Sequence, residues 1–242
     1  MSTPKSDDAS SLNLPFVGDH ESLRQRVTHA LRGALITGEM RPGVLYSAPS
    51  LADKFGVSAT PVRESMLDLA KEGLVKAVRN KGFRVTELSD RDLDEITAVR
   101  LLLEVPTIAD IARHVDETIA ARVEALRPMA RDIVDLANVG DLIAYVGTDL
   151  QFHAMMLALW GNHHLVEVVG DLRFRSRLYG LRELADHGQL GVSAGEHEEL
   201  IDLVLAGRAD KVASLMRGHI GHVRTIWAGR PDTKTPRRSG SG

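Results

Sequence analysis

Residues 47–62 read SAPSLADKFGVSATPV, and this stretch decides the fold of the front of the chain. Ser47 can cap a helix that carries Pro49 in its first turn, and Gly56 can end that helix because glycine tolerates a positive φ. Ser58 can then cap a second helix that starts almost at once. Two helices joined by a tight turn containing glycine are typical of a helix-turn-helix.

The flanking segments complete a small α+β unit. Residues 22–37 repeat apolar side chains at helical spacing, which predicts a helix before the quoted stretch. Residues 74–78 and 83–86 are short β-prone runs, and residues 79–82 between them predict a hairpin turn that carries two cations. A basic hairpin beside a helix-turn-helix can reach DNA phosphates or the minor groove. We therefore expect residues 21–88 to form a winged helix-turn-helix.

Charge is distributed unevenly along the 242 residues, although the formal net charge is only -3. Residues 21–88 hold 11 Lys and Arg against 7 Asp and Glu, which is a net charge of +4. Residues 89–228 hold 14 against 22, which is a net charge of -8. A basic unit joined to an acidic one indicates an anionic partner for the front unit and a different role for the rear unit.

The composition excludes several classes of protein. The chain has no cysteine, which rules out disulfides, zinc ribbons and iron–sulfur clusters. It has no run of apolar residues long enough to span a membrane, and its polar N-terminal segment is unlike a secretory signal. We therefore expect a cytoplasmic protein with no membrane partner. Residues 1–20 and 229–242 are rich in small polar and charged residues, and we expect them to be disordered tails.

Residues 89–228 show helical periodicity and no convincing strand, so we expect an all-α antiparallel bundle of six helices. The first helix begins after Ser89 and runs past Pro106, which should kink it. Five more helices follow, with short connections rich in Gly and Asn, at residues 118–137, 141–159, 162–186, 193–206 and 208–228. The predicted fold class is mainly α, with a winged helix-turn-helix in front of a helical bundle.

Polar residues interrupt the apolar stripes of this bundle. Asp149 and His153 lie one turn apart on the inward stripe of their helix, and His197 and His219 lie on the inward stripes of later helices. An unpaired charge in such an interior is costly. A divalent cation would neutralise Asp149 and accept nitrogen lone pairs from three neutral imidazoles, so these four residues are the predicted metal ligands. Zinc is our first choice for this mixed N/O set, and nickel, manganese and iron stay open.

The front unit resembles the winged helix-turn-helix of GntR-type bacterial transcription regulators. The resemblance covers residues 31–85 and is most specific in VSATPVRE at residues 57–64. It implies a double-stranded DNA operator as partner, with Thr60 and Arg63 contacting the DNA from the second helix. It also implies a DNA-contacting wing tip formed by Arg79, Asn80, Lys81 and Gly82.

The rear unit resembles the FCD domain of FadR-type regulators. The resemblance covers about residues 89–226 and rests on these features: the Asp149 and His153 pair, Gly161-Asn162, Glu196-His197, and GRADKVASLMRGHI at residues 207–220 with His219 inside it. It implies a helical bundle that dimerises and binds a small carboxylate effector beside a divalent metal. All four metal-binding positions of the metal-containing branch are occupied in this sequence.

Two residues are candidates for effector contacts. Arg100, in AVRLLLE at residues 98–104, matches an arginine of the first FCD helix and could be the counter-ion for an effector carboxylate. Asn162 is the second candidate. A further group of arginines forms either a salt-bridged face or another effector contact, and its members are Arg173, Arg175, Arg177 and Arg182. The role of His222 stays open.

Three functions are consistent with these patterns. The first is a regulator, most commonly a repressor in this architecture, whose homodimer binds an operator under the control of a carboxylate effector. The second keeps the fold but makes the metal structural, with no effector. The third is a metal-dependent hydrolase, because three histidines and an aspartate could polarise water. Four ligands without an adjacent base argue against an enzyme, and we expect Glu196 and Glu198 to point away from His197.

Overall fold

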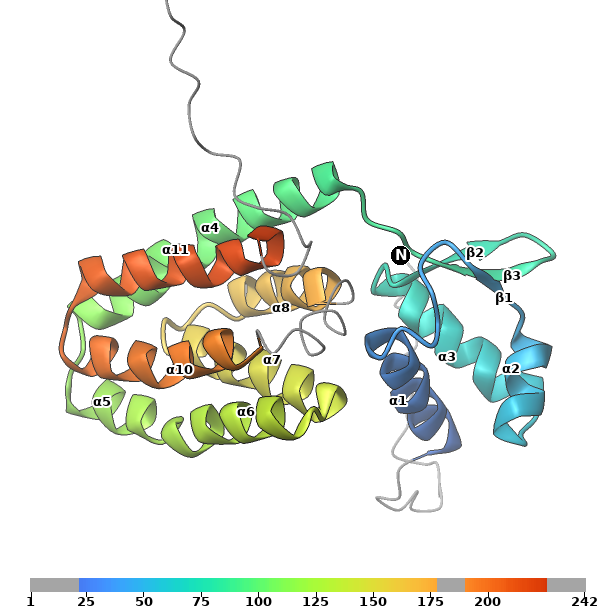
Figure 1. The fold of residues 1–242 in the computed structure, drawn as a ribbon, viewed down its shortest axis with the longest axis horizontal. Coiled ribbons are helices and arrows are strands. Elements are labelled where there is room, and N and C mark those ends of the chain that lie inside the picture. The colour runs from blue at the N-terminus through green and yellow to red at the C-terminus, as the bar shows by residue number, and fades with distance from the viewer. Residues whose placement is uncertain (1–21, 178–189, 226–242) are drawn as a thin grey trace, which may run out of the picture.

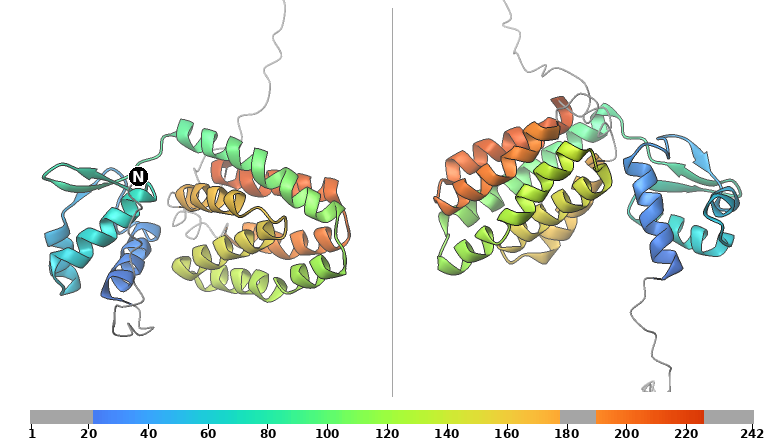
Figure 2. Two further views of the ribbon diagram at one scale, coloured as in Figure 1. Left: turned by 180° about the vertical axis from the view of Figure 1, so that it is seen from behind. Right: turned by 60° about the horizontal axis from the view of Figure 1, so that its bottom comes forward.

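The computed structural model describes residues 22–177 and 190–225 and arranges them as two units (Figure 1). The head is residues 22–88, and the bundle is residues 89–177 and 190–225. The two units lie side by side and are linked by the chain that leads into the first bundle helix (Figure 2). Four predicted segments lie outside the described residues: the tails 1–20 and 229–242, and the helical residues 178–186 and 226–228.

The head is a winged helix-turn-helix, as predicted. Its elements are α1 (Leu23–Ile36), β1 (Leu45–Tyr46), α2 (Ala48–Phe55), α3 (Ala59–Lys71), β2 (Val75–Val78) and β3 (Gly82–Val85). The Ser47 hydroxyl accepts the backbone N–H of Ser50 at 3.2 Å, and Gly56 ends α2 at φ 65°. Ser58 occupies the cap position of α3, but its side chain makes no capping hydrogen bond. The local signals that predicted the two helices therefore act as expected at Ser47 and Gly56, and Ser58 marks the start of α3 without a capping bond.

A three-stranded antiparallel sheet of order β1-β3-β2 forms the wing. Strand β1 was not predicted, because two residues are too few to show a periodic pattern. It pairs Leu45 with Arg84 and Tyr46 with Phe83. Gly82, predicted in the turn, is the first residue of β3 at φ 128°, where a Cβ atom would lie 2.3 Å from the carbonyl oxygen of Tyr46. Only glycine allows that approach of the two strands.

The bundle contains seven helices in its described residues: α4 (Asp90–Arg113), α5 (Glu117–Glu124), α6 (Arg127–Val139), α7 (Leu142–Ala158), α8 (His163–Arg177), α10 (Leu190–Leu205) and α11 (Ala209–Thr225). The single helix predicted at 118–137 is two, because α5 ends at Glu124 and α6 starts at Arg127, with Pro128 in its first turn. The helix predicted from residue 193 begins at Leu190. Helix α4 continues through Pro106.

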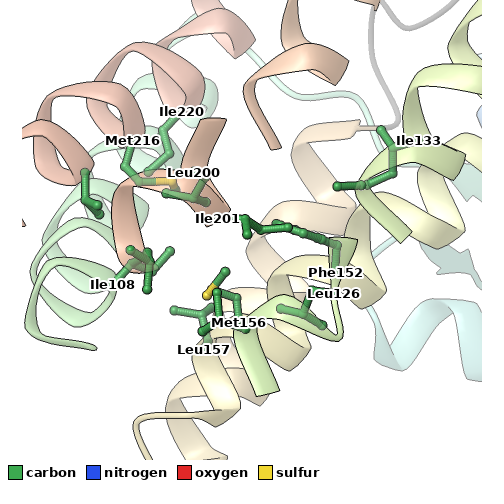
Figure 3. Close-up of a cluster of buried hydrophobic side chains, with 14 of the residues drawn as sticks. Ile108, Leu126, Ile133, Phe152, Met156, Leu157, Leu200, Ile201, Met216 and Ile220 are labelled. Atoms are coloured by element: carbon green, nitrogen blue, oxygen red, sulfur yellow. The ribbon is translucent and has the colours of Figure 1, made fainter. Parts of the chain in front are cut away.

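The bundle core is built from the apolar stripes of these helices (Figure 3). Ile108, Ile133, Phe152, Met156 and Ile201 have no exposed surface. Burying each side chain of this size contributes about 1.5–3 kcal/mol before the entropy of ordering the chain is subtracted. This packing holds α4, α7, α8, α10 and α11 around a group of buried polar residues. In the part of the chain that the structure describes, no helix has the length and apolar character needed to cross a bilayer.

Candidate metal centre and nucleic-acid interface

The four predicted metal ligands meet inside the bundle. Asp149 and His153 come from α7, His197 from α10 and His219 from α11, and all four side chains are buried. Each offers one ligand atom within 4.8 Å of the others. Nε2 of His153 lies 3.1 Å from Nε2 of His197, and Oδ1 of Asp149 lies 3.4 Å from Nε2 of His197. The sequence pattern therefore identified a real cluster.

Neighbouring groups orient two of the imidazoles. Nδ1 of His197 lies 2.9 Å from the carbonyl oxygen of Ala194, and Nδ1 of His219 lies 2.7 Å from Oε2 of Glu196. Each acceptor favours the tautomer that carries its proton on Nδ1, so that Nε2 presents a lone pair. Acceptors of this kind are the usual outer partners of metal-binding histidines, where they fix the ring and raise its basicity.

Glu196 was expected to point away from His197, and the contact that its carboxylate makes is with His219, another member of the cluster. The spacing places Glu196 beside His197 on α10, but its carboxylate turns to α11 and contacts His219. Nδ1 of His222, whose role was open, lies 3.5 Å from the same carboxylate oxygen. Glu198 does lie away from the cluster and pairs with Arg131 on the surface. Sequence spacing could not reveal the contact of Glu196, because it depends on how two helices pack.

Burial controls the charge state of the site. Burial lowers the pKa of His153 well below its ordinary value, and the nearby Arg173 guanidinium lowers it further, while Asp149 opposes the shift. Burial also raises the pKa of Glu196 to about 7, with the charge of Glu199 adding to the effect. His153 is therefore neutral at pH 7 and keeps a lone pair available for a metal.

A network of buried charges adjoins the cluster. Glu104 accepts from Nε of Arg100 at 2.7 Å and from Nε of Arg173 at 2.8 Å. Nη1 of Arg173 lies 3.7 Å from Oδ2 of Asp149, and Arg100 donates to the hydroxyl of Ser176. Burial alone would raise the pKa of Glu104, but the two guanidinium groups hold it below its ordinary value.

This network corrects one step of the sequence argument. Asp149 was treated as a buried charge that a divalent cation would compensate best, whereas Arg173 supplies a counter-charge from α8. The two arginines and two carboxylates already balance, so the case for a metal rests on the convergence of the donor atoms. Arg173 was among the undecided arginines, and Glu104 was missed, although its position four residues after Arg100 on one helix was a usable signal.

Asn162 has a structural contact of its own. It is exposed, and its side-chain oxygen accepts the backbone N–H of Leu165 at 3.1 Å, which caps the start of α8. The effector contact of Asn162 stays a prediction.

The predicted DNA-contacting residues lie on the outer face of the head. Thr60 and Arg63 are exposed in the first turns of α3, and the exposed side chains of the hairpin come from Arg79, Asn80 and Lys81. A groove of about 500 Å³ lies between α3 and the wing, with Arg63, Arg79 and Lys81 among its lining residues. The recognition helix and the wing thus present cations to one surface, as expected for phosphate contacts.

A winged helix-turn-helix with a basic groove, joined to a helical bundle, defines the class of DNA-binding transcription regulators. The chain belongs to the GntR family of bacterial regulatory proteins, and it carries an FCD domain. Residues 23–85 match the family described as bacterial regulatory proteins, gntR family, and residues 95–222 match the FCD domain.

Relatives with known names support this assignment. The chain is 28% identical over 174 residues to the HTH-type transcriptional regulator McbR of Escherichia coli (strain K12), covering 66% of this chain and 79% of McbR. It is 27% identical over 195 residues to the HTH-type transcriptional repressor GlaR of the same organism, covering 78% of this chain and 89% of GlaR. These relatives are transcription regulators and not enzymes.

Solved structures show the same fold. Escherichia coli McbR/YncC superposes with a TM-score of 0.69 at 22% identity, over 87% of this chain and 99% of that chain. A GntR transcriptional regulator from Rhodococcus sp. RHA1 superposes with a TM-score of 0.64 at 23% identity, over 85% of this chain and 97% of the other.

Proposed function

We propose that this chain is a metabolite-responsive transcription repressor. Its homodimer binds a double-stranded operator through the heads, and a small carboxylate bound beside a divalent metal in the bundle controls operator affinity. The observation that carries the proposal is the convergence of Asp149, His153, His197 and His219 inside a domain attached to a DNA-binding head. Because the proposed partner is DNA, we also propose that the protein acts in the cytoplasm.

The donor set fits a divalent metal. Oδ1 of Asp149 and Nε2 of His153, His197 and His219 would hold it, and the outer partners Ala194 and Glu196 already orient two of the rings. Three nitrogen donors and one oxygen suit zinc, with nickel, manganese and iron as alternatives. A bound ion would supply a Lewis acid to which a carboxylate oxygen can coordinate.

Charge balance supports an anionic effector. The side chains of Arg100 and Arg173 offset those of Glu104 and Asp149, so a divalent cation would leave the interior with a net positive charge. Burying uncompensated charge is costly, and a carboxylate ligand would reduce that cost. Arg100 and Arg173 are the candidate counter-ions, since arginine binds carboxylates through two parallel hydrogen bonds. An effector would compete with Glu104 for them.

An exposed apolar stripe on α4 supports dimer formation by a second copy of the chain. Val99 and Leu102 expose 41% and 74% of their surface, and Pro106 is exposed one turn further along. Two heads held by such a contact would place their recognition helices on half-sites about one DNA turn apart.

The test is a salt titration of operator binding, using a duplex that the wild-type chain selects from a random library. Log K should fall with log salt at a slope of about -0.9 per phosphate contact. A flat titration contradicts DNA binding. In parallel, a set of small carboxylates is screened by thermal shift against zinc-loaded protein, because a ligand that binds the folded state raises the melting temperature.

The thermal-shift screen tests the structural-metal alternative, and a turnover assay tests the hydrolase alternative. A purely structural metal predicts that chelation lowers the melting temperature while no carboxylate changes it. A hydrolase predicts turnover by zinc-loaded protein that is lost in Asp149→Ala.

A further inference from the structure

The last described turn of α8 faces two different parts of the molecule. Arg173 and Ser176, three residues apart, face the buried charge network of the bundle. Phe174 and Arg175, which lie between them, contact the head. One helical turn therefore contacts both the charge network beside the candidate metal centre and the DNA-binding unit.

On the bundle side, this turn is held by the charges next to the centre. Arg173 donates to Glu104 and lies 3.7 Å from Oδ2 of Asp149, a predicted metal ligand. Ser176 accepts from Arg100 at 3.4 Å. A change in the charge that Asp149 presents, or an anion drawn to the arginines, alters the forces on this turn directly.

On the head side, Arg175 caps the recognition helix. Its Nε donates to the carbonyl oxygen of Glu72 at 3.1 Å, and Glu72 is the C-cap residue of α3. The last carbonyls of a helix lack partners within the helix, so a guanidinium there satisfies one of them and interacts well with the helix dipole. Gly73 follows at φ 77°, and a Cβ atom there would lie 3.1 Å from the Arg175 guanidinium.

Phe174 joins the two units by packing. It lies against the core of the bundle and against the core of the head. The guanidinium of Arg32, from α1, lies 5.4 Å from its ring centroid, and Nη2 of Arg32 lies 2.6 Å from Oε1 of Glu72. Helix α8 is thus connected to both α1 and the end of α3.

We propose that Phe174 and Arg175 are positioning residues through which the buried centre controls the recognition helix. This inference rests on the proposed function. Because Arg173, Phe174 and Arg175 are consecutive residues of one helix, a shift of Arg173 relative to Asp149 moves Phe174 and Arg175 with it. That movement acts on the C-terminal end of α3, whose N-terminal end carries Thr60 and Arg63. Two sites whose ligands bias the same element are coupled in free energy.

A rival route runs through α7, which carries Asp149 and also touches the head. Ile143 of α7 packs on Gly33 of α1, where a Cβ atom would lie 2.9 Å from Cδ1 of Ile143. This contact reaches α1 and not the end of α3, so the two routes can be separated by mutation.

The experiment compares Arg175→Gln and Phe174→Leu with two control variants of the full chain. Ile143→Ala weakens the rival contact, and Arg131→Gln removes an arginine that pairs with Glu198 within the bundle. Zinc affinity is measured by calorimetry. Affinity for the selected duplex is measured with zinc and with a chelator, and hydrogen exchange is followed at the amides of residues 69–74 in both states.

In the wild type, zinc should change duplex affinity by a factor of about 5–150 and change exchange at residues 69–74. Arg175→Gln and Phe174→Leu should reduce the factor to about two or less and remove the exchange difference, with zinc affinity unchanged. The two control variants should keep both responses. Exchange provides an independent readout of α3 if a variant binds DNA weakly in both states.

Several results would overturn the inference. One is zinc binding that leaves wild-type duplex affinity and α3 exchange unchanged. Another is a full zinc response in both Arg175→Gln and Phe174→Leu, or loss of the response in Ile143→Ala alone. Failure of zinc to bind the wild type would instead overturn the metal site, and with it the basis of this route.

Discussion

Oε2 of Glu196 on α10 lies 2.7 Å from Nδ1 of His219 on α11. The contact orients the imidazole so that its other nitrogen faces Asp149, His153 and His197. It makes Glu196 an outer partner of the candidate metal centre. The metal site can therefore be tested by substituting Glu196 while all four predicted ligands are kept.

Removing this acceptor should weaken zinc binding without abolishing it. We expect Glu196→Ala to reduce zinc affinity by about 10–100-fold, because outer partners of metal-bound histidine contribute about that much. Glu196→Gln keeps a neutral acceptor and should lose less. Competition with a chromophoric chelator measures both. Glu198→Gln, from the surface pair with Arg131 on the same helix, is the control, and an equal loss in all three variants would contradict the assigned contact.

Removing a ligand should have a larger effect. The wild type should bind one zinc ion per chain, and His153→Ala should bind with an affinity lower by more than about 100-fold, beyond the range expected for an outer partner. Metal analysis after dialysis checks the stoichiometry. His164→Ala alters an exposed histidine of α8 and should leave zinc content unchanged. Zinc content that is unaffected in His153→Ala would refute the site.

Glu104 should contribute stability that depends on pH. Burial raises its pKa, but Arg173 and Arg100 more than offset this, so the folded pKa lies below the value of about 4.3 expected in the unfolded chain. A group with a lowered folded pKa stabilises the fold at pH values above the unfolded pKa. That stability is lost as the pH falls toward the folded pKa.

At pH 7, Glu104→Gln should lower the free energy of unfolding by about 3–5 kcal/mol, because it leaves two buried arginines with one carboxylate fewer. The difference from the wild type should shrink as the pH falls below about 4. Urea denaturation at both pH values measures this. Glu198→Gln, from the surface pair with Arg131, should cost only about 0–1 kcal/mol. A loss for Glu104→Gln that is the same at pH 7 and pH 3.5 would contradict the assignment.

The wing and the recognition helix should contribute differently to operator binding. Lys81→Ala should weaken binding to all sequences alike and reduce the salt slope by about one, as expected for a phosphate contact. Arg63→Ala, if Arg63 reads a base, should cost about 1–3 kcal/mol and relax sequence preference at one position. Fluorescence anisotropy with selected and scrambled duplexes separates the two effects. Lys211→Ala on the exposed face of α11 is the control.

Helix ends and helix faces that depend on residues close in sequence could be predicted. Ser47 starts α2 and Gly56 ends it, through contacts with residues at most four positions away. The spacing of Asp149 and His153 places both on one face of α7. The helical periods of later stripes also placed His197 and His219 in the same interior. The break between α5 and α6 was missed because the apolar pattern continues across it.

By itself, the sequence determined the head, the helical nature of the bundle and which four side chains turn inward, because these depend on backbone preferences and on periods of a few residues. Only the tertiary structure decided the partners of those side chains. Arg173 meets Glu104 across 69 positions, Glu196 turns to a neighbouring helix, and Arg175 reaches Glu72 across 103 positions. Such pairings depend on how helices pack against one another, and the period of a single helix carries no information about that.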